Sequence, residues 1–269
     1  MALIHVENMS FGYGDRPVLD RIGFGVDKGQ VFCLIGPNGC GKTTLLDCIL
    51  GLNKSIEGRI EIRGKDMKTC GSSWRAMSMA YVPQSHESAF PYTVFDMVLM
   101  GRTAHLSFFS NPGPDDNAIA HEALSMVGIQ DMAQRPFTML SGGERQLVLI
   151  ARALAQKTPV IIMDEPTAHL DFSHEFIVLE TIMTLVREKK IAVIMATHFP
   201  NHAYYFESHG IDTRVAMLHQ GRFMRLGPAD DVLTTEAIQT LYGIGATIVS
   251  FEQDGKIRKH VIPVKGVGN

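Results

Sequence analysis

The sequence predicts an α/β fold in which a parallel sheet carries an antiparallel side layer and an inserted helical region. Short apolar runs without alternation are typical of parallel strands buried on both faces. Such runs occur at 31–35, 160–163 and 191–196. Amphipathic stretches alternate with them, which favours helices packed on the sheet. These stretches lie at 42–50, 141–156 and 174–188. The antiparallel side layer is expected from three earlier segments: 3–7, 18–26 and 58–63.

We expect these elements to form one domain over residues 1–269. The α/β core with its side layer is expected in 1–88 and 156–220. Between 89 and 155 strand signals disappear and helical periodicity takes over, which predicts a helical subdomain inserted into the core.

Two finer predictions concern the insertion and the C-terminal region. In the insertion, Asp115 or Asp116 follows a loop rich in Pro and Gly and is expected to cap the next helix. In the C-terminal region, 221–269, we expect a short strand, a helix over 229–242 and a hairpin that turns at 254–255, an Asp-Gly pair.

Composition narrows the class of protein. The 269 residues are 45% hydrophobic, which is enough for a full core without a disulfide framework. The four cysteines show no zinc-like spacing, and a reducing, cytoplasmic setting is expected. Neither a signal peptide nor a window of eighteen apolar residues is present, so we expect no membrane span. With a net charge of -3 and no Lys/Arg run, nucleic acid is not an expected partner.

A glycine-rich loop joins the first parallel strand to the first amphipathic helix. Gly36, Gly41, Lys42 and Thr43 have the spacing of a Walker A phosphate loop. Backbone N–H groups of such a loop and the start of the helix attract phosphate oxygens, while the lysine adds a charge and the Thr hydroxyl suits magnesium. On this motif alone the function is no narrower than nucleotide binding, and the candidate nucleotide ligands are Gly36, Pro37, Asn38, Gly39, Cys40, Gly41, Lys42, Thr43 and Thr44. The alternative is a glycine-rich turn that binds nothing.

Polar side chains follow three further apolar runs, where ligands of parallel sheets bind. Asp164 and Glu165 end the run at 160–163; Asp164 suits magnesium and Glu165 suits the polarisation of an attacking water. His198 ends another run and is a candidate contact for the γ-phosphate, if the two strands are neighbours; a purely structural histidine is the alternative. Gln84 follows a third run and suits magnesium or water.

One motif has no role within a single phosphate-loop domain. This is the segment Leu-Ser-Gly-Gly-Glu-Arg-Gln at 140–146, which starts a helix. Together with the phosphate loop, Gln84, the Asp-Glu pair and His198, in this order, it makes nearly the whole chain resemble the ABC ATPases. The resemblance implies a P-loop NTPase (RecA-like) core that binds ATP and Mg²⁺.

The resemblance also implies a head-to-tail homodimer with two composite sites. The residues expected to bind ATP held by the other copy are Ser141, Gly142, Gly143 and Glu144. Asp171 matches the loop that links the two sites, and Tyr13 matches the aromatic residue that stacks on adenine; a half-buried strand tyrosine is the alternative for Tyr13.

The segment after Gln84 and the late segment 241–251 are similar to the ATPases of importers for siderophore-iron, haem, cobalamin or molybdate. That resemblance implies a peripheral position on the cytoplasmic face of the inner membrane, with membrane-spanning permease subunits as partners and a substrate-binding protein as an indirect one. The candidates for a groove that receives the permease are Phe90, Tyr92, Val94, Met97 and Met100, with ordinary helix packing as the alternative. An export ATPase, a DNA-associated ATPase and a metabolic kinase are the rival interpretations.

Overall fold

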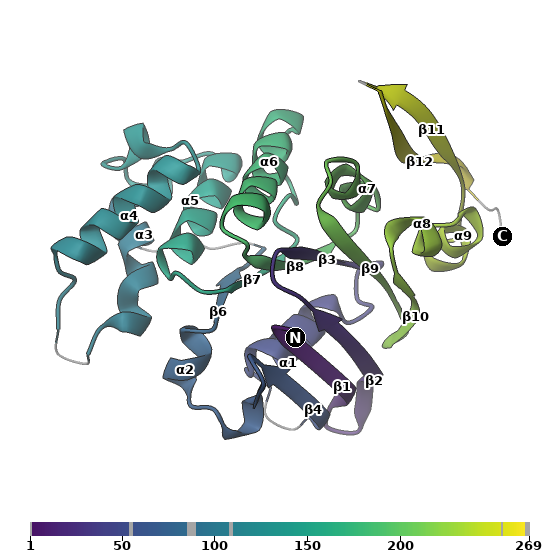
Figure 1. Ribbon diagram of the computed structural model, residues 1–269, viewed down its shortest axis with the longest axis horizontal. Helices are drawn as coiled ribbons and strands as arrows, with labels where there is room; N and C mark the ends of the chain where they lie inside the picture. The colour runs from purple at the N-terminus through teal and green to yellow at the C-terminus, as the bar shows by residue number, and fades with distance from the viewer. Residues whose placement is uncertain (1, 54–55, 85–89, 108–109, 254, 267–269) are drawn as a thin grey trace.

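The computed structural model describes residues 2–53, 56–84, 90–107, 110–253 and 255–266. Within them, a six-stranded sheet in the order β10-β9-β3-β8-β7-β6 crosses the middle of the molecule (Figure 1). Its strands are β3 (Gln30–Ile35), β6 (Met79–Val82), β7 (Val160–Asp164), β8 (Ala192–Thr197), β9 (Asp212–His219) and β10 (Arg222–Gly227). All neighbouring pairs are parallel except β9 and β10. The predicted parallel sheet is confirmed.

The two faces of this sheet pack against different layers. In β3, Val31, Cys33 and Ile35 belong to a core shared with the helices α5 (Gly142–Ala155), α6 (Phe172–Glu188) and α7 (Asn201–Ser208). Phe32 and Leu34 point the other way, into a core shared with α1 (Lys42–Leu50) and the side layer. Because successive side chains of a strand alternate between faces, burial on both sides requires the continuous apolar run of β3.

The side layer is an antiparallel sheet in the order β2-β1-β4-β5. Its strands are β1 (Ile4–Tyr13), β2 (Arg16–Val26), β4 (Glu57–Ile62) and β5 (Lys65–Asp66). Buried and exposed residues alternate in the second half of β2, as expected for a sheet with one face toward the core and the other toward solvent. In Figure 1 it lies below the central sheet, beside α1.

A group of helices occupies one end of the molecule, next to β6 (Figure 1). Its helices are α3 (Val94–Leu99), α4 (Pro114–Met126) and α5, with 3₁₀ turns η2 (Met100–His105), η3 (Gln130–Met132) and η4 (Phe137–Met139); η1 (Met67–Thr69) and α2 (Ser72–Ala76) precede β6. The prediction that Asp115 or Asp116 caps α4 is confirmed only in part. The N-cap position is Gly113, and Asp116 takes part from the third helical position, where its side chain accepts a hydrogen bond from the Gly113 N–H at 3.0 Å. Pro114 favours this earlier start because proline suits the first helical position.

Two of the residues expected to line a docking groove lie in the core instead. Val94 and Met97 are 0% and 1% exposed and pack in the interior of the helical region. They are consecutive inward positions of α3, three residues apart. Phe90, Tyr92 and Met100 are exposed by 65%, 40% and 39% and stay candidates.

The C-terminal region contains two helices where one was predicted. They are α8 (Ala229–Val232) and α9 (Thr235–Tyr242), and Leu233 and Thr234 separate them. The Thr234 side chain accepts a hydrogen bond from the Ala237 N–H, which caps a new helix and competes with continuation of the first.

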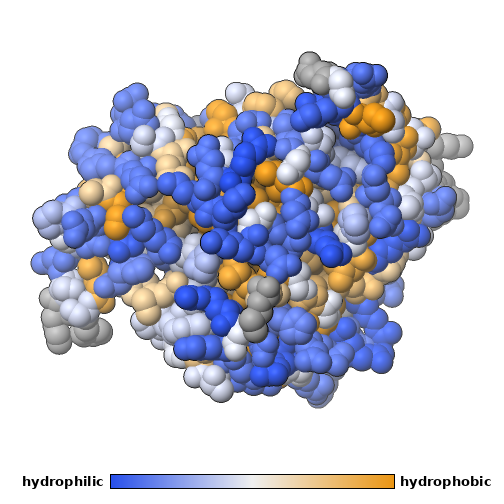
Figure 2. Space-filling model, in the orientation of Figure 1, coloured by the Kyte–Doolittle hydropathy of each residue, from blue (hydrophilic) through white to orange (hydrophobic). Residues whose placement is uncertain are grey.

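The predicted C-terminal hairpin pairs β11 (Ile244–Gln253) with β12 (Lys256–Gly266). Of its predicted turn, Asp254 lies outside the described residues and Gly255 has a φ of 70°. The hairpin rises beyond α7 and α9 in Figure 1. Figure 2 shows this side of the molecule as mostly hydrophilic, with separate hydrophobic patches. No described helix combines the length and apolar character that crossing a bilayer requires.

Candidate functional site

The phosphate loop connects the end of β3 to the start of α1, as the sequence predicts. Gly39 and Gly41 have φ values of 77° and 109°, a region that favours glycine. A Cβ on Gly36 would lie 2.6 Å from both the Leu218 carbonyl oxygen and the Cys40 sulfur. The glycines therefore permit a tight turn and a close approach of backbones, which a side chain would prevent.

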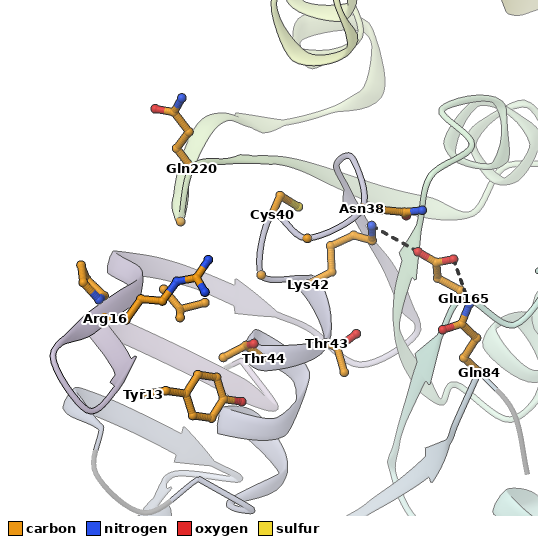
Figure 3. Close-up of a pocket in the computed structure, with 15 residues that line it drawn as sticks. Tyr13, Arg16, Asn38, Cys40, Lys42, Thr43, Thr44, Gln84, Glu165 and Gln220 are labelled. Carbon is orange, nitrogen blue, oxygen red and sulfur yellow. Dashed lines mark hydrogen bonds and ion pairs between the residues drawn. The ribbon is translucent and has the colours of Figure 1, made fainter.

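Lys42 is buried at the base of this loop. Its Nζ donates to the carbonyl oxygens of Gly36 at 2.8 Å and Pro37 at 3.3 Å. The same Nζ forms an ion pair with Glu165 Oε1 at 3.2 Å, and the two side chains are only 5% and 11% exposed. Figure 3 shows this ion pair as a dashed line across the cavity. Three contacts thus hold the lysine charge in place at the base of the loop.

Glu165 lies where three neighbouring strands end. It follows β7, and its N–H donates to the Ala196 carbonyl of β8 at 3.0 Å. Its second carboxylate oxygen, Oε2, is 3.2 Å from His198 Nδ1 and 3.5 Å from Gln84 Nε2. The expected neighbourhood of Glu165, His198 and Gln84 is confirmed, because β6, β7 and β8 are adjacent in the sheet.

The backbone of Glu165 is unusual, with a φ of 47° in the left-handed region. A non-glycine residue in this conformation is strained, and such strain clusters at functional sites. This conformation ends the extended backbone of β7 at Asp164. The two neighbouring carboxylates, Asp164 and Glu165, therefore approach the phosphate loop from different positions.

The surroundings of Asp164 show whether this site suits magnesium. It is 3% exposed, and its Oδ1 has no hydrogen-bond partner among the described atoms. Burial raises its pKa, and a hydrogen bond with the Thr43 side chain opposes that effect. A buried, unpartnered carboxylate oxygen beside a hydroxyl fits Mg²⁺, which prefers hard oxygen ligands and keeps phosphate and water in its shell. Among the described residues no three His, Cys, Asp or Glu side chains are grouped to hold a metal alone.

Lys42, Thr43, Gln84 and Glu165 line a cavity of about 730 Å³, and Asp164 and His198 lie beside it without lining it. Its walls are formed by Tyr13, Arg16, Pro17, Val18, Asn38, Gly39, Cys40, Gly41, Lys42, Thr43, Thr44, Gln84, Glu165, Gln220 and Gly221. Tyr13 is 56% exposed and lies opposite Glu165, as Figure 3 shows. An exposed aromatic ring at one end and a phosphate loop at the other suit a nucleotide.

Sequence reasoning missed two polar residues of this cavity. Arg16 begins β2, and Gln220 lies in the turn between β9 and β10. The position of Arg16 could have been predicted from the sequence, because Arg16 and Tyr13 flank the same hairpin turn between β1 and β2. The position of Gln220 could not, because only the tertiary fold brings its turn to the phosphate loop.

The segment 140–146, called here the Ser141 motif, lies away from this cavity. None of Ser141, Gly142, Gly143 and Asp171 is among the described residues that line the cavity. Ser141 caps α5: its hydroxyl accepts from the Glu144 N–H at 3.2 Å, and Glu144 Oε2 accepts from the Ser141 N–H at 2.7 Å. Glu144 Oε1 also pairs with Arg135 at 2.9 Å, so both its carboxylate oxygens are engaged.

Asp171 lies beside this motif. Its carboxylate caps α6 by accepting from the His174 N–H at 2.9 Å, and it pairs with His174 Nδ1 at 2.8 Å. The His174 ring packs on Gly143, where a Cβ would come within 2.2 Å of ring atoms. Ser141, Gly142 and Asp171 are exposed, so one surface carries the helix start and the acidic cap.

Comparisons with known proteins show which family the chain belongs to. Residues 19–168 match the family model described as ABC transporter. The chain is 34% identical to the molybdate import ATP-binding protein of Haemophilus influenzae, over 97% of this chain and 96% of that protein. It is 34% identical to the iron(3+)-hydroxamate import ATP-binding protein of Bacillus subtilis, over 95% and 93%.

A solved structure is similar along the whole length. It is titled an inward-facing conformation of a putative metal-chelate type ABC transporter, with a TM-score of 0.86, 33% identity and coverage of 98% of each chain. The phosphate loop, the Asp-Glu pair and the Ser141 helix start all lie within the residues matched by the family model. The chain therefore belongs to the ABC transporter family, as one of its ATP-binding subunits.

Proposed function

We propose that this chain hydrolyses Mg-ATP in a head-to-tail dimer and so powers the import of a metal-containing substrate through separate membrane subunits. The observation that carries the proposal is the convergence of Lys42, Gln84 and His198 on Glu165 at the edge of the sheet. Four groups from four separate segments meet there, and three of them, Lys42, Gln84 and Glu165, line a cavity large enough for a nucleotide.

Each group has a distinct task in hydrolysis. Glu165 holds the attacking water and takes its proton, as a positioned general base does. Lys42 neutralises charge on the β- and γ-phosphates, and His198 contacts the γ-phosphate. Thr43, Asp164 and Gln84 hold Mg²⁺, which neutralises phosphate charge when bound.

Adenine stacks on Tyr13 at the open end of the cavity. The remaining members of the loop contribute backbone and side-chain contacts to the phosphates: Gly36, Pro37, Asn38, Gly39, Cys40, Gly41 and Thr44. All but Gly36 and Pro37 line the cavity, and the Gly36 and Pro37 carbonyls hold Lys42.

The second copy completes the site. In one chain Ser141 and Gly142 are exposed on a helix start that does not reach its own cavity. The N–H groups of such a start, and the positive end of the α5 dipole, suit the γ-phosphate of a nucleotide held by another copy. Gly143 and Asp171 lie beside this helix start, and Glu144 supports it by holding the cap.

We infer the direction of transport and the class of substrate from similar proteins. The relatives named above import molybdate and iron-hydroxamate, and the similar solved structure is described as metal-chelate type. We therefore place the chain peripherally on the cytoplasmic face of the inner membrane, with a substrate-binding protein acting outside. The domain division proposed is a core in 1–88 and 156–220, a helical subdomain in 89–155 and a C-terminal region in 221–269.

A groove between the core and the helical region suits the membrane subunit. It measures about 470 Å³, and Met100 and Leu52 line it together with Arg75 and Arg152. Exposed methionine adapts to a partner surface.

The test is ATP hydrolysis by the purified chain, alone and with the membrane subunits that copurify with it. Phosphate release should require Mg²⁺, and reconstitution in vesicles should give ATP-dependent entry of the metal compound that copurifies with the complex. A complex that hydrolyses ATP and drives only outward movement would refute the import assignment. Stimulation of hydrolysis by DNA instead would refute the transport assignment.

A further inference from the structure

His202 is a buried histidine next to the hydrolytic site that the proposed function does not use. It lies in the first turn of α7 and is 3% exposed. Its Nδ1 is 3.0 Å from the Thr197 hydroxyl, and its Nε2 is 2.7 Å from Glu175 Oε1. Both ring nitrogens are therefore engaged by side chains of the protein.

These contacts form one connected network. Thr197 Oγ1 accepts from the Phe199 N–H at 3.1 Å and is also hydrogen-bonded to His202 Nδ1. A carboxylate oxygen only accepts, so His202 Nε2 donates to Glu175. Every member has a partner, and such complete networks hold one geometry firmly.

At one end, this network holds the loop that carries His198. Thr197 is the last residue of β8, and His198 follows it directly. The Thr197 hydroxyl bridges the Phe199 N–H to His202, so it ties together both residues that flank His198. The His198 carbonyl also accepts from the Tyr242 hydroxyl at 3.2 Å. The imidazole that reaches Glu165 is therefore held through its backbone from two sides.

At the other end, the network reaches the surface that carries the Ser141 motif. Glu175 lies in the first turn of α6, whose cap is Asp171. In the same turn His174 contacts both Asp171 and Gly143. A continuous series of contacts thus runs from the exposed helix start, through the beginning of α6 and His202, to His198.

We propose that His202 is a positioning residue for ATP hydrolysis, which makes the placement of His198 depend on where the start of α6 lies. The inference rests on the proposed function, in which the start of α6 faces the other copy and His198 contacts the γ-phosphate. Closure of the dimer then acts on His198 of the same chain through Glu175, His202 and Thr197, and this couples the two nucleotide sites.

The test uses the full chain with Mg-ATP and three disrupting variants: Thr197→Val, His202→Ala and Glu175→Ala. Each should lower kcat by about 3- to 30-fold, because changes along such networks alter coupling by that order. Each should leave the Kd for ATP within about twofold, because none touches the cavity walls. The Hill coefficient for ATP should fall toward one. Adding Glu175→Ala to Thr197→Val should cost no further activity, as expected for members of one network.

Matched controls come from the same helices. Glu180 of α6 accepts a hydrogen bond from Tyr205 of α7, a second link between these helices that does not lead to His198. Glu180→Ala and Tyr205→Phe should keep kcat within about twofold of the original chain, and Thr197→Ser should keep it as well, because the hydroxyl remains. Equal losses in controls and disrupting variants, unchanged kcat in the latter, or additive losses in the double variant would overturn the proposal.

Failure of the proposed function and failure of the role of His202 give different results in this experiment. A starting chain that does not hydrolyse ATP at all refutes the proposed function, whereas active controls together with fully active Thr197→Val refute only the role of His202. Should His202→Ala fail to fold, Glu175→Ala carries the same test, since the Glu175 side chain is 29% exposed.

Discussion

Replacement of Glu165 by Gln is the sharpest test of the hydrolytic site. The amide keeps the size of the carboxylate and its place at the end of β7, but it cannot take a proton from water. A positioned general base is worth about 100- to 10,000-fold, or about 2.7 to 5.4 kcal/mol in activation free energy. We expect kcat to fall by that factor.

The same variant should bind ATP as tightly as the original chain or more tightly. Glu165 Oε1 lies 3.2 Å from Lys42 Nζ and competes with phosphate for that charge. Because the amide is neutral, it withdraws less of the lysine charge from an incoming phosphate. Steady-state phosphate release and equilibrium binding of ATP measure the two effects separately. Light scattering should show a dimer of this variant at saturating Mg-ATP.

Glu188→Gln, an exposed change near the end of α6, is the matched control and should leave both quantities unchanged. A Glu165→Gln variant whose Kd for ATP rises while kcat stays unchanged would show that Glu165 serves binding and not catalysis. A variant that stays monomeric at saturating ATP, with or without its membrane partner, would refute closure of the dimer.

Three further predictions follow from the geometry. Tyr13→Ala should weaken ATP binding by about three- to tenfold while Tyr13→Phe should not, since stacking needs only the ring; equal effects in a binding titration would contradict this. Burial raises the pKa of the Cys40 thiol. The rate of its labelling by maleimide should therefore be slow at neutral pH, and it should go on rising at pH values where the rate for an exposed cysteine no longer increases. Mg-ATP should block the labelling; equal labelling with and without nucleotide would contradict a place in the phosphate loop. Ser141→Ala should lower the free energy of unfolding by about 0.5 to 2 kcal/mol through loss of the α5 cap, whereas Ser141→Thr keeps the acceptor, and a denaturant titration that finds no difference would refute the capping role.

The sequence predicts most of the core and of the phosphate site because their signals are local. A continuous apolar run such as β3 indicates burial on both faces, and the glycines that follow permit a tight turn that other residues would resist. Asp164 and Glu165 stand out because carboxylates rarely end a buried strand without a ligand. The adjacency of β7 and β8 was a condition of the prediction for His198, and the sheet order meets it.

Other features depend on contacts that no local pattern contains. Periodicity marks Val94 and Met97 as one face of a helix, but it does not say whether that face meets the core or a partner. The break between α8 and α9 comes from one threonine side chain that bonds to the backbone, a choice that helical periodicity does not reveal. The partners of His202 come from α6 and β8, and only the tertiary fold brings them together.

Under the proposed function, the base and the phosphate share the same neighbouring side chains. Lys42, His198 and Gln84 all contact the Glu165 carboxylate, and under that function the first two also contact the γ-phosphate while Gln84 lies at the metal. A phosphate group with its magnesium would carry more charge and more acceptor oxygens than one carboxylate, so it would compete with Glu165 for these donors. The position of the base and the binding of phosphate are therefore linked through three shared side chains, and a change at any of them should alter both.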